Sequence, residues 1–223
     1  MKKIFMMMVA VMFSLIIGFS SCSSCGSKAP DIKPVADSAL VDNKTAKPAL
    51  VVENLISTDR QAMYLKFKDN YRWYETGVLL PEFLDSEDVT SDPEMVVNVF
   101  QAIIEAGKGF DTWVYKFQHF PDGTLLTDSI KGFWIEDFPL DEEEIAVKYL
   151  DAYDKIMATN APKPHSKNCI LRKPIGPVAC NAQYVFGNIK EQLWVDAKTG
   201  DVKNSSPAFP KEKGFKMPLG EWP

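Results

Sequence analysis

The chain has 223 residues and is acidic, with 25 lysines and arginines against 30 aspartates and glutamates and a formal net charge of −5. This balance argues against a nucleic-acid-binding protein, because nucleic-acid phosphates demand a basic face. It also disfavours electrostatic adhesion to anionic lipid. We therefore expect the partner to be a protein, a peptide, a glycan or a small molecule.

Residues 1–21 have the form of an export signal peptide. Lys2 and Lys3 give a basic start, and the apolar run 5–19 is shorter than the roughly 20 residues of a spanning helix. Small residues then lead to Cys22. The sequence Phe19-Ser20-Ser21-Cys22 resembles the lipobox of Gram-negative envelope lipoproteins, whose cysteine receives a diacylglycerol and becomes the first mature residue. This resemblance implies an outer membrane lipoprotein, anchored through lipid on Cys22.

Two alternatives for this junction stay open. One is an ordinary secretory signal cleaved near Ser21, and the other is acylation of Cys25. Residues 22–49 mix Ser, Ala, Pro, Lys and Asp without aromatics, which predicts a disordered tether. Residues 23–26 lack the acidic residues that direct some lipoproteins to the surface, so we expect the periplasmic side.

The first part of the folded region, residues 50–140, predicts an α+β unit. Thr58-Asp59-Arg60-Gln61 has the form of a capping box that opens a short helix, and 71–80 favours a strand. Asp92-Pro93 predicts a helix start, followed by apolar residues at helical spacing: Val96, Val99, Phe100, Ile103 and Ile104.

Three strands are expected next. Residues 113–118 alternate between aromatic and other side chains, which is the period of a half-buried strand. The sequence Pro121-Asp122-Gly123 is typical of a turn, and it predicts a partner strand from Leu125. A further antiparallel strand is expected across 133–138.

Residues 141–204 predict a second α+β unit. Asp141 and Glu144 open a helix whose buried stripe is Ile145, Tyr149, Ala152, Tyr153 and Ile156. Strands are expected at 169–172, 178–186 and 191–196, with a short last strand near Val202. Residues 205–223 suggest an irregular tail. The two units, each a helix followed by an antiparallel meander, would pack as one domain or as two small subdomains.

The second unit is similar in arrangement to PepSY-type domains of the bacterial envelope. The similarity rests on the acidic helix start Asp141-Glu142-Glu143-Glu144 and on the run 193–202, where a strand ends in Asp196 and a Thr199-Gly200 turn precedes the final strand. The hairpin between Cys169 and Cys180 departs from the compact form of that family. The resemblance implies binding or inhibition rather than chemistry.

Cys169 and Cys180 predict a disulfide. Export would place them in an oxidising compartment, and they flank a Pro-Ile-Gly-Pro turn that folds the chain back. The bridge would close a loop of about ten residues and contribute about 3 kcal/mol. The alternative is a redox or nucleophilic pair, although no CxxC motif lowers either pKa.

No familiar catalytic, metal or cofactor motif stands in the sequence, so we expect a protein without enzymatic activity, metal or cofactor. The competing hypothesis is a glycan- or peptide-processing envelope hydrolase. It requires at least two of Glu75, His119, Glu136 and Asp137 to converge in one cleft. A third hypothesis is a structural subunit of an envelope assembly.

The tryptophans are the remaining residues that indicate a possible binding surface. Four fall on expected strands and are candidate ligand-binding residues, because outward rings suit a peptide or a sugar: Trp73, Trp113, Trp134 and Trp194. Taken together, the sequence predicts a lipid-anchored cell-envelope protein whose domain binds a protein, peptide or glycan without covalent chemistry.

Overall fold

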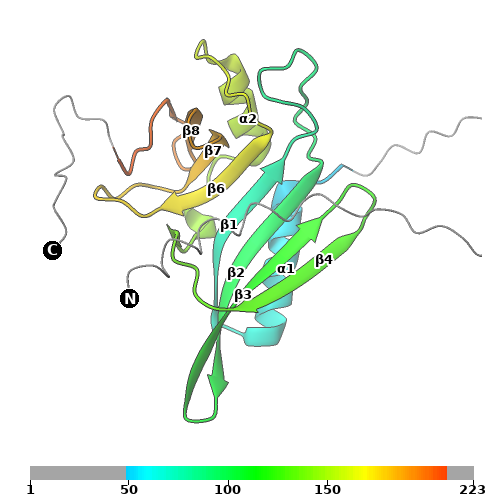
Figure 1. Ribbon diagram of the computed structural model, residues 1–223, viewed down its shortest axis with the longest axis vertical. Helices are drawn as coiled ribbons and strands as arrows, with labels where there is room; N and C mark the ends of the chain where they lie inside the picture. Colours follow the sequence, from blue (N-terminus) through cyan, green and yellow to red (C-terminus); the bar gives the residue numbers. More distant parts are fainter. Residues whose placement is uncertain (1–48, 210–223) are drawn as a thin grey trace, which may run out of the picture. The chain divides into compact units, whose positions relative to one another are not determined.

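The computed structural model describes residues 49–209 as two α-helices, a short 3₁₀ helix and nine strands (Figure 1). The expected signal peptide, Cys22 and nearly all of the expected tether lie outside the described residues. The elements are α1 (Val52–Phe67), β1 (Tyr71–Leu79), β2 (Met95–Ala106), β3 (Gly109–His119), β4 (Leu125–Lys131), β5 (Asp137–Phe138), η1 (Glu142–Glu144), α2 (Tyr149–Ala158), β6 (Asn168–Pro174), β7 (Gln183–Gly187), β8 (Gln192–Asp196) and β9 (Val202–Lys203).

The strands form one antiparallel sheet. Its order is β4-β3-β2-β1-β6-β7-β8-β9, and β5 pairs with β6 outside this path. The strands expected before and after residue 141 therefore meet through β1 and β6. The expected class, helices combined with antiparallel strands, is confirmed.

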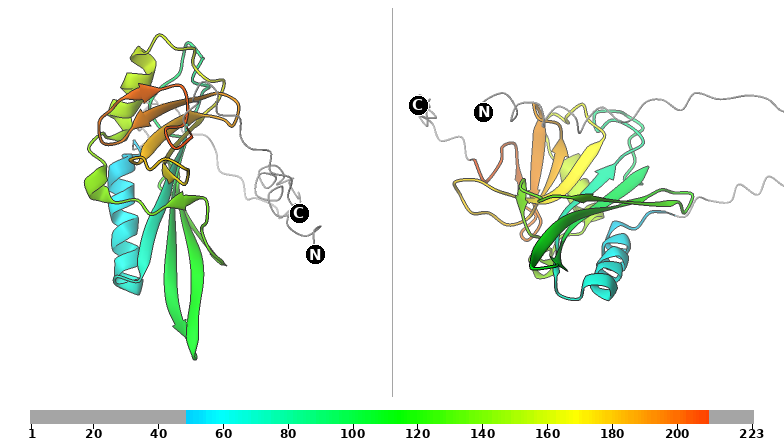
Figure 2. Two further views of the ribbon diagram at one scale, coloured as in Figure 1. Left: turned by 90° about the vertical axis from the view of Figure 1, so that its left-hand side faces the viewer. Right: turned by 60° about the horizontal axis from the view of Figure 1, so that its bottom comes forward.

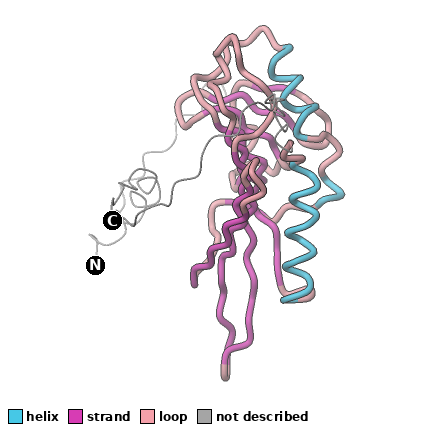
Figure 3. Tube along the Cα trace, turned by 90° about the vertical axis from the view of Figure 1, so that its right-hand side faces the viewer, coloured by secondary structure: helices cyan, strands magenta, loops and turns pink. Residues whose placement is uncertain are grey.

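Both helices lie against the same face of the sheet (Figures 2 and 3). α1 packs on β1 and β2, and α2 packs on β7 and β8. Alternation along each strand sends one set of side chains toward the helices. The core between the layers includes Met63, Trp73, Phe100, Phe117, Tyr149, Ile156, Leu171, Phe186 and Val195. We call the side that the helices pack against the covered face and the other side the open face.

The helix expected after Asp92-Pro93 is wrong, since this segment is strand β2. Val96, Asn98, Phe100 and Ala102 are buried on the covered face, and Val99 is buried on the open face. A strand that is apolar on both faces cannot be told from a helix by periodicity, and its β-branched residues favour the strand.

The other elements follow the expectations more closely. Strands β3 and β4 and the turn between them are confirmed, with Gly123 at a φ of 86° that glycine tolerates. α1 begins at Val52, earlier than expected. Asp141 caps only the 3₁₀ turn η1, by accepting from the Glu143 amide, and α2 begins at Tyr149. Of the strand expected across 133–138, only β5 pairs.

In the part of the chain that the structure describes, no helix has the length and apolar character needed to cross a bilayer.

Candidate functional site

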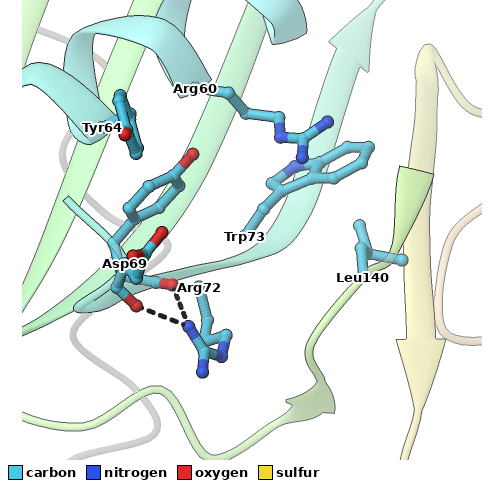
Figure 4. Close-up of a pocket in the computed structure, with 7 residues that line it drawn as sticks. Arg60, Tyr64, Asp69, Arg72, Trp73 and Leu140 are labelled. Carbon is cyan, nitrogen blue, oxygen red and sulfur yellow. Dashed lines mark hydrogen bonds between the residues drawn. The ribbon is translucent and has the colours of Figure 1, made fainter. Parts of the chain in front are cut away.

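A groove runs beside the start of β1, where α1 and the segment after β5 approach it. Its first hollow has a volume of about 220 Å³ (Figure 4) and is lined by Arg60, Tyr64, Asp69, Tyr71, Arg72, Trp73 and Leu140. A second hollow of about 550 Å³ is lined by Arg72, Phe138, Pro139, Leu140, Asp141, Glu144 and Lys173. Because the two hollows share Arg72 and Leu140, we treat them as one groove and call it the Arg72 groove.

The walls of the Arg72 groove are held by backbone contacts. The Leu140 amide donates to the Trp73 carbonyl at 2.7 Å, which ties the segment after β5 to β1. The Trp73 indole is 3 % exposed, and its Nε1 donates to the Glu75 carbonyl and to Thr76 Oγ1. The tryptophan is therefore a fixed wall, whereas Tyr64 at 48 % exposure lies at the rim.

The cations of the groove differ in their partners. Arg60 pairs with Glu142, and Lys173 Nζ lies 2.7 Å from Glu144 Oε2. Arg72 Nη1 instead donates to two backbone carbonyls, at 2.9 Å to Asp69 and 2.7 Å to Tyr71 (Figure 4). Arg72 forms no ion pair with any described residue, so its charge is not neutralised by a contacting carboxylate.

A second polar cluster lies on the open face. Glu75 stands between Arg172 on β6 and Val99 on β2 in the strand register, and Lys116 of β3 follows in the same row. Asp137, whose side chain is fully buried, accepts from Arg172 Nε at 2.6 Å. Charged side chains of four strands therefore lie together: Arg172 of β6, Glu75 of β1, Lys116 of β3 and Asp137 of β5.

Glu75 and Asp137 differ in how their charges are satisfied. Burial and the neighbouring charges of Asp137 and Glu136 together raise the pKa of Glu75 to about 7, against the attraction of Arg172 and Lys116. Burial also raises the pKa of Asp137, while Arg172 opposes that rise. The Glu75 carboxylate accepts no hydrogen bond from a described residue, which distinguishes it from the carboxylate of Asp137.

His119 belongs to a different network, on the covered face. Its Nε2 lies 2.8 Å from Asp59 Oδ2, and Asn98 Nδ2 donates to the same oxygen at 2.7 Å. Thr76 Oγ1 donates to Asn98 Oδ1 and accepts from Trp73, which links this network to the wall of the Arg72 groove. Burial raises the pKa of Asp59, against these hydrogen bonds.

The residues of the hydrolase hypothesis are therefore divided between the faces. Glu75, Glu136 and Asp137 influence one another on the open face, whereas His119 is bonded to Asp59 on the covered face. His119 is not part of the carboxylate cluster. Neither hollow of the Arg72 groove includes that cluster.

The four candidate tryptophans have four different environments. Trp73 lines the Arg72 groove, and Trp113 is partly buried against the core. Trp134 is half-buried, donates from Nε1 to Asp137, and its backbone amide donates to Gln101. Trp194 is buried, and its Nε1 has no hydrogen-bond partner among the described residues. They do not form one aromatic surface.

Cys169 and Cys180 are free cysteines in the structure, so the predicted bridge is not formed there. Cys169 is fully buried in the core on β6, and burial raises its pKa. Cys180 is half-buried in a hollow shared with Asn181, Asp196 and Lys203. In the described part of the chain, no group of three or more His, Cys, Asp and Glu side chains could hold a metal.

Sequence reasoning did not single out Arg60 or Arg72 as site residues. Arg60 lies on α1 and Arg72 on β1, and the third wall, around Leu140, comes from far along the chain. Only the fold brings them together, so no local pattern signals the groove.

Comparison with known proteins gives no match to a family model, to a curated protein or to a solved structure.

Proposed function

We propose that this chain is a lipid-anchored cell-envelope protein whose folded domain binds a peptide or protein partner without covalent chemistry. The observation that carries the binding role is the Arg72 groove, where an arginine that forms no ion pair to a described residue lies beside the fixed wall of Trp73. Acylation of Cys22 and a position on the periplasmic side of the outer membrane remain part of the proposal, on the sequence features alone.

Arg72, the basic residue of the groove without an ion pair to a described residue, favours a ligand that brings a negative charge. A guanidinium presents donors in a planar fork that matches a carboxylate, and such charge-assisted bonds are stronger than neutral ones. Phe138, which is 47 % exposed, gives apolar surface beside Arg72, and the buried side chains of Trp73 and Leu140 form the walls. An acidic or carboxyl-terminal peptide fits this combination of a positive charge and an exposed aromatic ring.

We further propose that the domain consists of two α+β units joined edge to edge, the second PepSY-like. The sheet order supports this arrangement, because α1 precedes β1–β4, α2 precedes β6–β9, and the first strand of each set pairs with the other. In this account the sheet is continuous across the junction of the units.

The binding role is tested by site-specific photocrosslinking in cells. A benzoylphenylalanine at Tyr64, on the groove rim, is expected to crosslink to a discrete partner in the envelope. The matched control is the same probe at Ile189, which is 95 % exposed and lies beyond the other end of β1, past β7. Equal crosslinking from both positions, or none from Tyr64, would reject the groove as the binding site.

A hydrolase is the second candidate, because three carboxylates meet around Arg172 on the open face. A half-buried acid with a pKa near neutrality is suited to proton transfer. In this second candidate Glu75 is the acid or base, and Glu75→Gln would abolish turnover of a glycan or peptide substrate. Turnover that survives Glu75→Gln would reject it.

A further inference from the structure

The outer edge of β4 is the long free edge of the sheet. All seven residues of β4 are exposed, and β4 ends the strand order, so among the described residues no strand pairs with its outer side. The opposite end of the sheet is β9, which has only two residues. Short edge strands are one way in which proteins avoid unwanted pairing, and β4 lacks that protection.

The hydrogen-bond register fixes which backbone groups of β4 point outward. The Phe120 amide donates to the Thr124 carbonyl, and the Gly132 amide donates to the Thr112 carbonyl, so hydrogen-bonded pairs fall on the even residues of β4. The odd residues, Leu125, Thr127, Ser129 and Lys131, therefore direct their N–H and C=O groups to the free side. An extended backbone can pair with them.

The side chains of β4 that share the open face are Leu126, Asp128 and Ile130, by strand alternation. Leu126 and Ile130 are 52 % and 54 % exposed. The pattern along this edge is thus an apolar, an acidic and an apolar side chain at alternate positions.

Asp128 ends a row of charges that crosses the sheet. Directly paired residues place Arg172, Glu75, Val99, Lys116 and Asp128 side by side on the open face, so the charges alternate in sign around one valine. A strand added beyond β4 would continue this row. Opposite charges are favoured in directly opposed cross-strand pairs, so the added strand needs a basic residue opposite Asp128.

The Asp128 carboxylate is also hydrogen-bonded to one of the outward N–H groups of β4. Its Oδ1 accepts from the Ser129 amide at 2.7 Å, which places the carboxylate at the outer side of β4. Two copies of β4 pairing about Asp128 would oppose two carboxylates, which disfavours a second copy. A basic residue would instead draw Asp128 into an ion pair and release the Ser129 N–H for the incoming backbone.

We propose that the β4 edge binds an extended peptide segment of a partner protein by strand addition, with a lysine or arginine opposite Asp128 and apolar residues two positions to either side. The apolar residues lie opposite Leu126 and Ile130. This surface is distinct from the Arg72 groove, and the proposal does not depend on the groove.

The probe is a fluorescent heptapeptide of sequence Thr-Val-Thr-Lys-Thr-Val-Thr with blocked ends, and its partner probe replaces the lysine with glutamate. Anisotropy titration with the 223-residue chain is expected to give about threefold tighter binding of the lysine peptide, the size of a cross-strand charge pair. Asp128→Lys is expected to reverse this preference. Equal affinities for the two peptides in both proteins would overturn the proposal.

Backbone pairing is tested at Thr127, whose N–H points outward. Thr127→Pro removes that donor without removing a bond to β3, since proline is tolerated where an edge N–H faces solvent. It is expected to abolish binding, whereas Thr127→Val keeps the donor and retains binding. Unchanged binding by Thr127→Pro would overturn strand addition.

Self-association through β4 is tested by hydrogen exchange in the absence of peptide. If protection of residues 125–131 grows with protein concentration, the edge binds a second copy of the chain, and the proposal is overturned.

Discussion

Asp59 on the covered face and Glu75 on the open face are carboxylates held in opposite ways. On the covered face, Asp59 accepts from Asn98 and contacts His119, and no other carboxylate contributes to its pKa. On the open face, the Glu75 carboxylate accepts no hydrogen bond from a described residue and faces the charges of Asp137 and Glu136. A satisfied carboxylate stabilises a fold, whereas an unsatisfied one destabilises it when charged. Asp59 therefore belongs to a network that stabilises the fold, whereas the Glu75 carboxylate of the open face has no hydrogen-bond donor among the described residues.

The largest effect is expected from breaking the ion pair of the open face. Arg172→Met leaves the buried Asp137 carboxylate without its cation, and removing one partner of a buried pair costs about 3 kcal/mol of unfolding free energy. Urea denaturation of the variant at pH 8 measures this loss.

The control for Arg172→Met is the double variant Arg172→Met with Asp137→Leu, which removes the unpaired charge and should recover most of the stability. A single variant as stable as the parent chain would contradict the assigned ion pair.

On the covered face, Asp59→Ala removes the acceptor shared by Asn98 and His119. Asn98 and His119 then lose a buried partner, which should lower the unfolding free energy by about 2 kcal/mol. Urea denaturation at pH 7 measures this loss. Asp59→Asn keeps the shape and one acceptor, so it should lose less. If both variants unfold at the parent midpoint, the network has no stabilising role.

Glu75→Gln should stabilise the chain at alkaline pH. The folded state holds the Glu75 proton up to a pKa of about 7, above the ordinary value of 4.5, so the unfolded state releases that proton first. Parent stability therefore falls as pH rises from about 4.5 to about 7. After an allowance for solvent screening at this half-buried site, the loss is about 1–2 kcal/mol.

The glutamine of this variant stays neutral at every pH, so the gain of Glu75→Gln should be present at pH 8 and absent at pH 4. Denaturation midpoints across this range measure it, and Glu94→Gln, at an exposed carboxylate, is the matched control. A gain that is equal at both pH values would contradict the raised pKa.

The smallest effect is expected at the Arg60–Glu142 pair beside the groove. The two side chains are 32 % and 66 % exposed, and surface ion pairs contribute less than about 1 kcal/mol. Arg60→Gln should therefore shift the denaturation midpoint only slightly, and less in high salt. A loss as large as that of Arg172→Met would remove the distinction between the open-face cluster and the groove.

The sequence predicted the class of the fold and most strands, because alternation and turn chemistry are local. Trp113 to Gln118 and the Gly123 turn are examples. Strand β2 was mistaken for a helix because Val96, Val99 and Phe100 are buried on both faces of a central strand, which erases the period of two. The convergence of Glu75 with Asp137 was foreseen only as a requirement of the hydrolase hypothesis.

The site could be predicted only in part. Trp73 was a candidate and lines the groove, but Arg60 and Arg72 carry no local signal, since an arginine on a helix and one on a strand look like ordinary surface residues. The hydrolase hypothesis grouped His119 with the carboxylates of the open face, although strand register directs it to α1.

The most direct test of the binding role is the affinity of the partner that crosslinks through position 64. Arg72→Gln should weaken binding of that partner to the 223-residue chain at least tenfold, as expected for loss of a hydrogen bond to a charged group. Lys190→Gln removes one exposed positive charge outside the residues that line the groove and should leave the affinity unchanged. Equal affinity of the Arg72→Gln variant and the parent chain would contradict the Arg72 groove as the binding site.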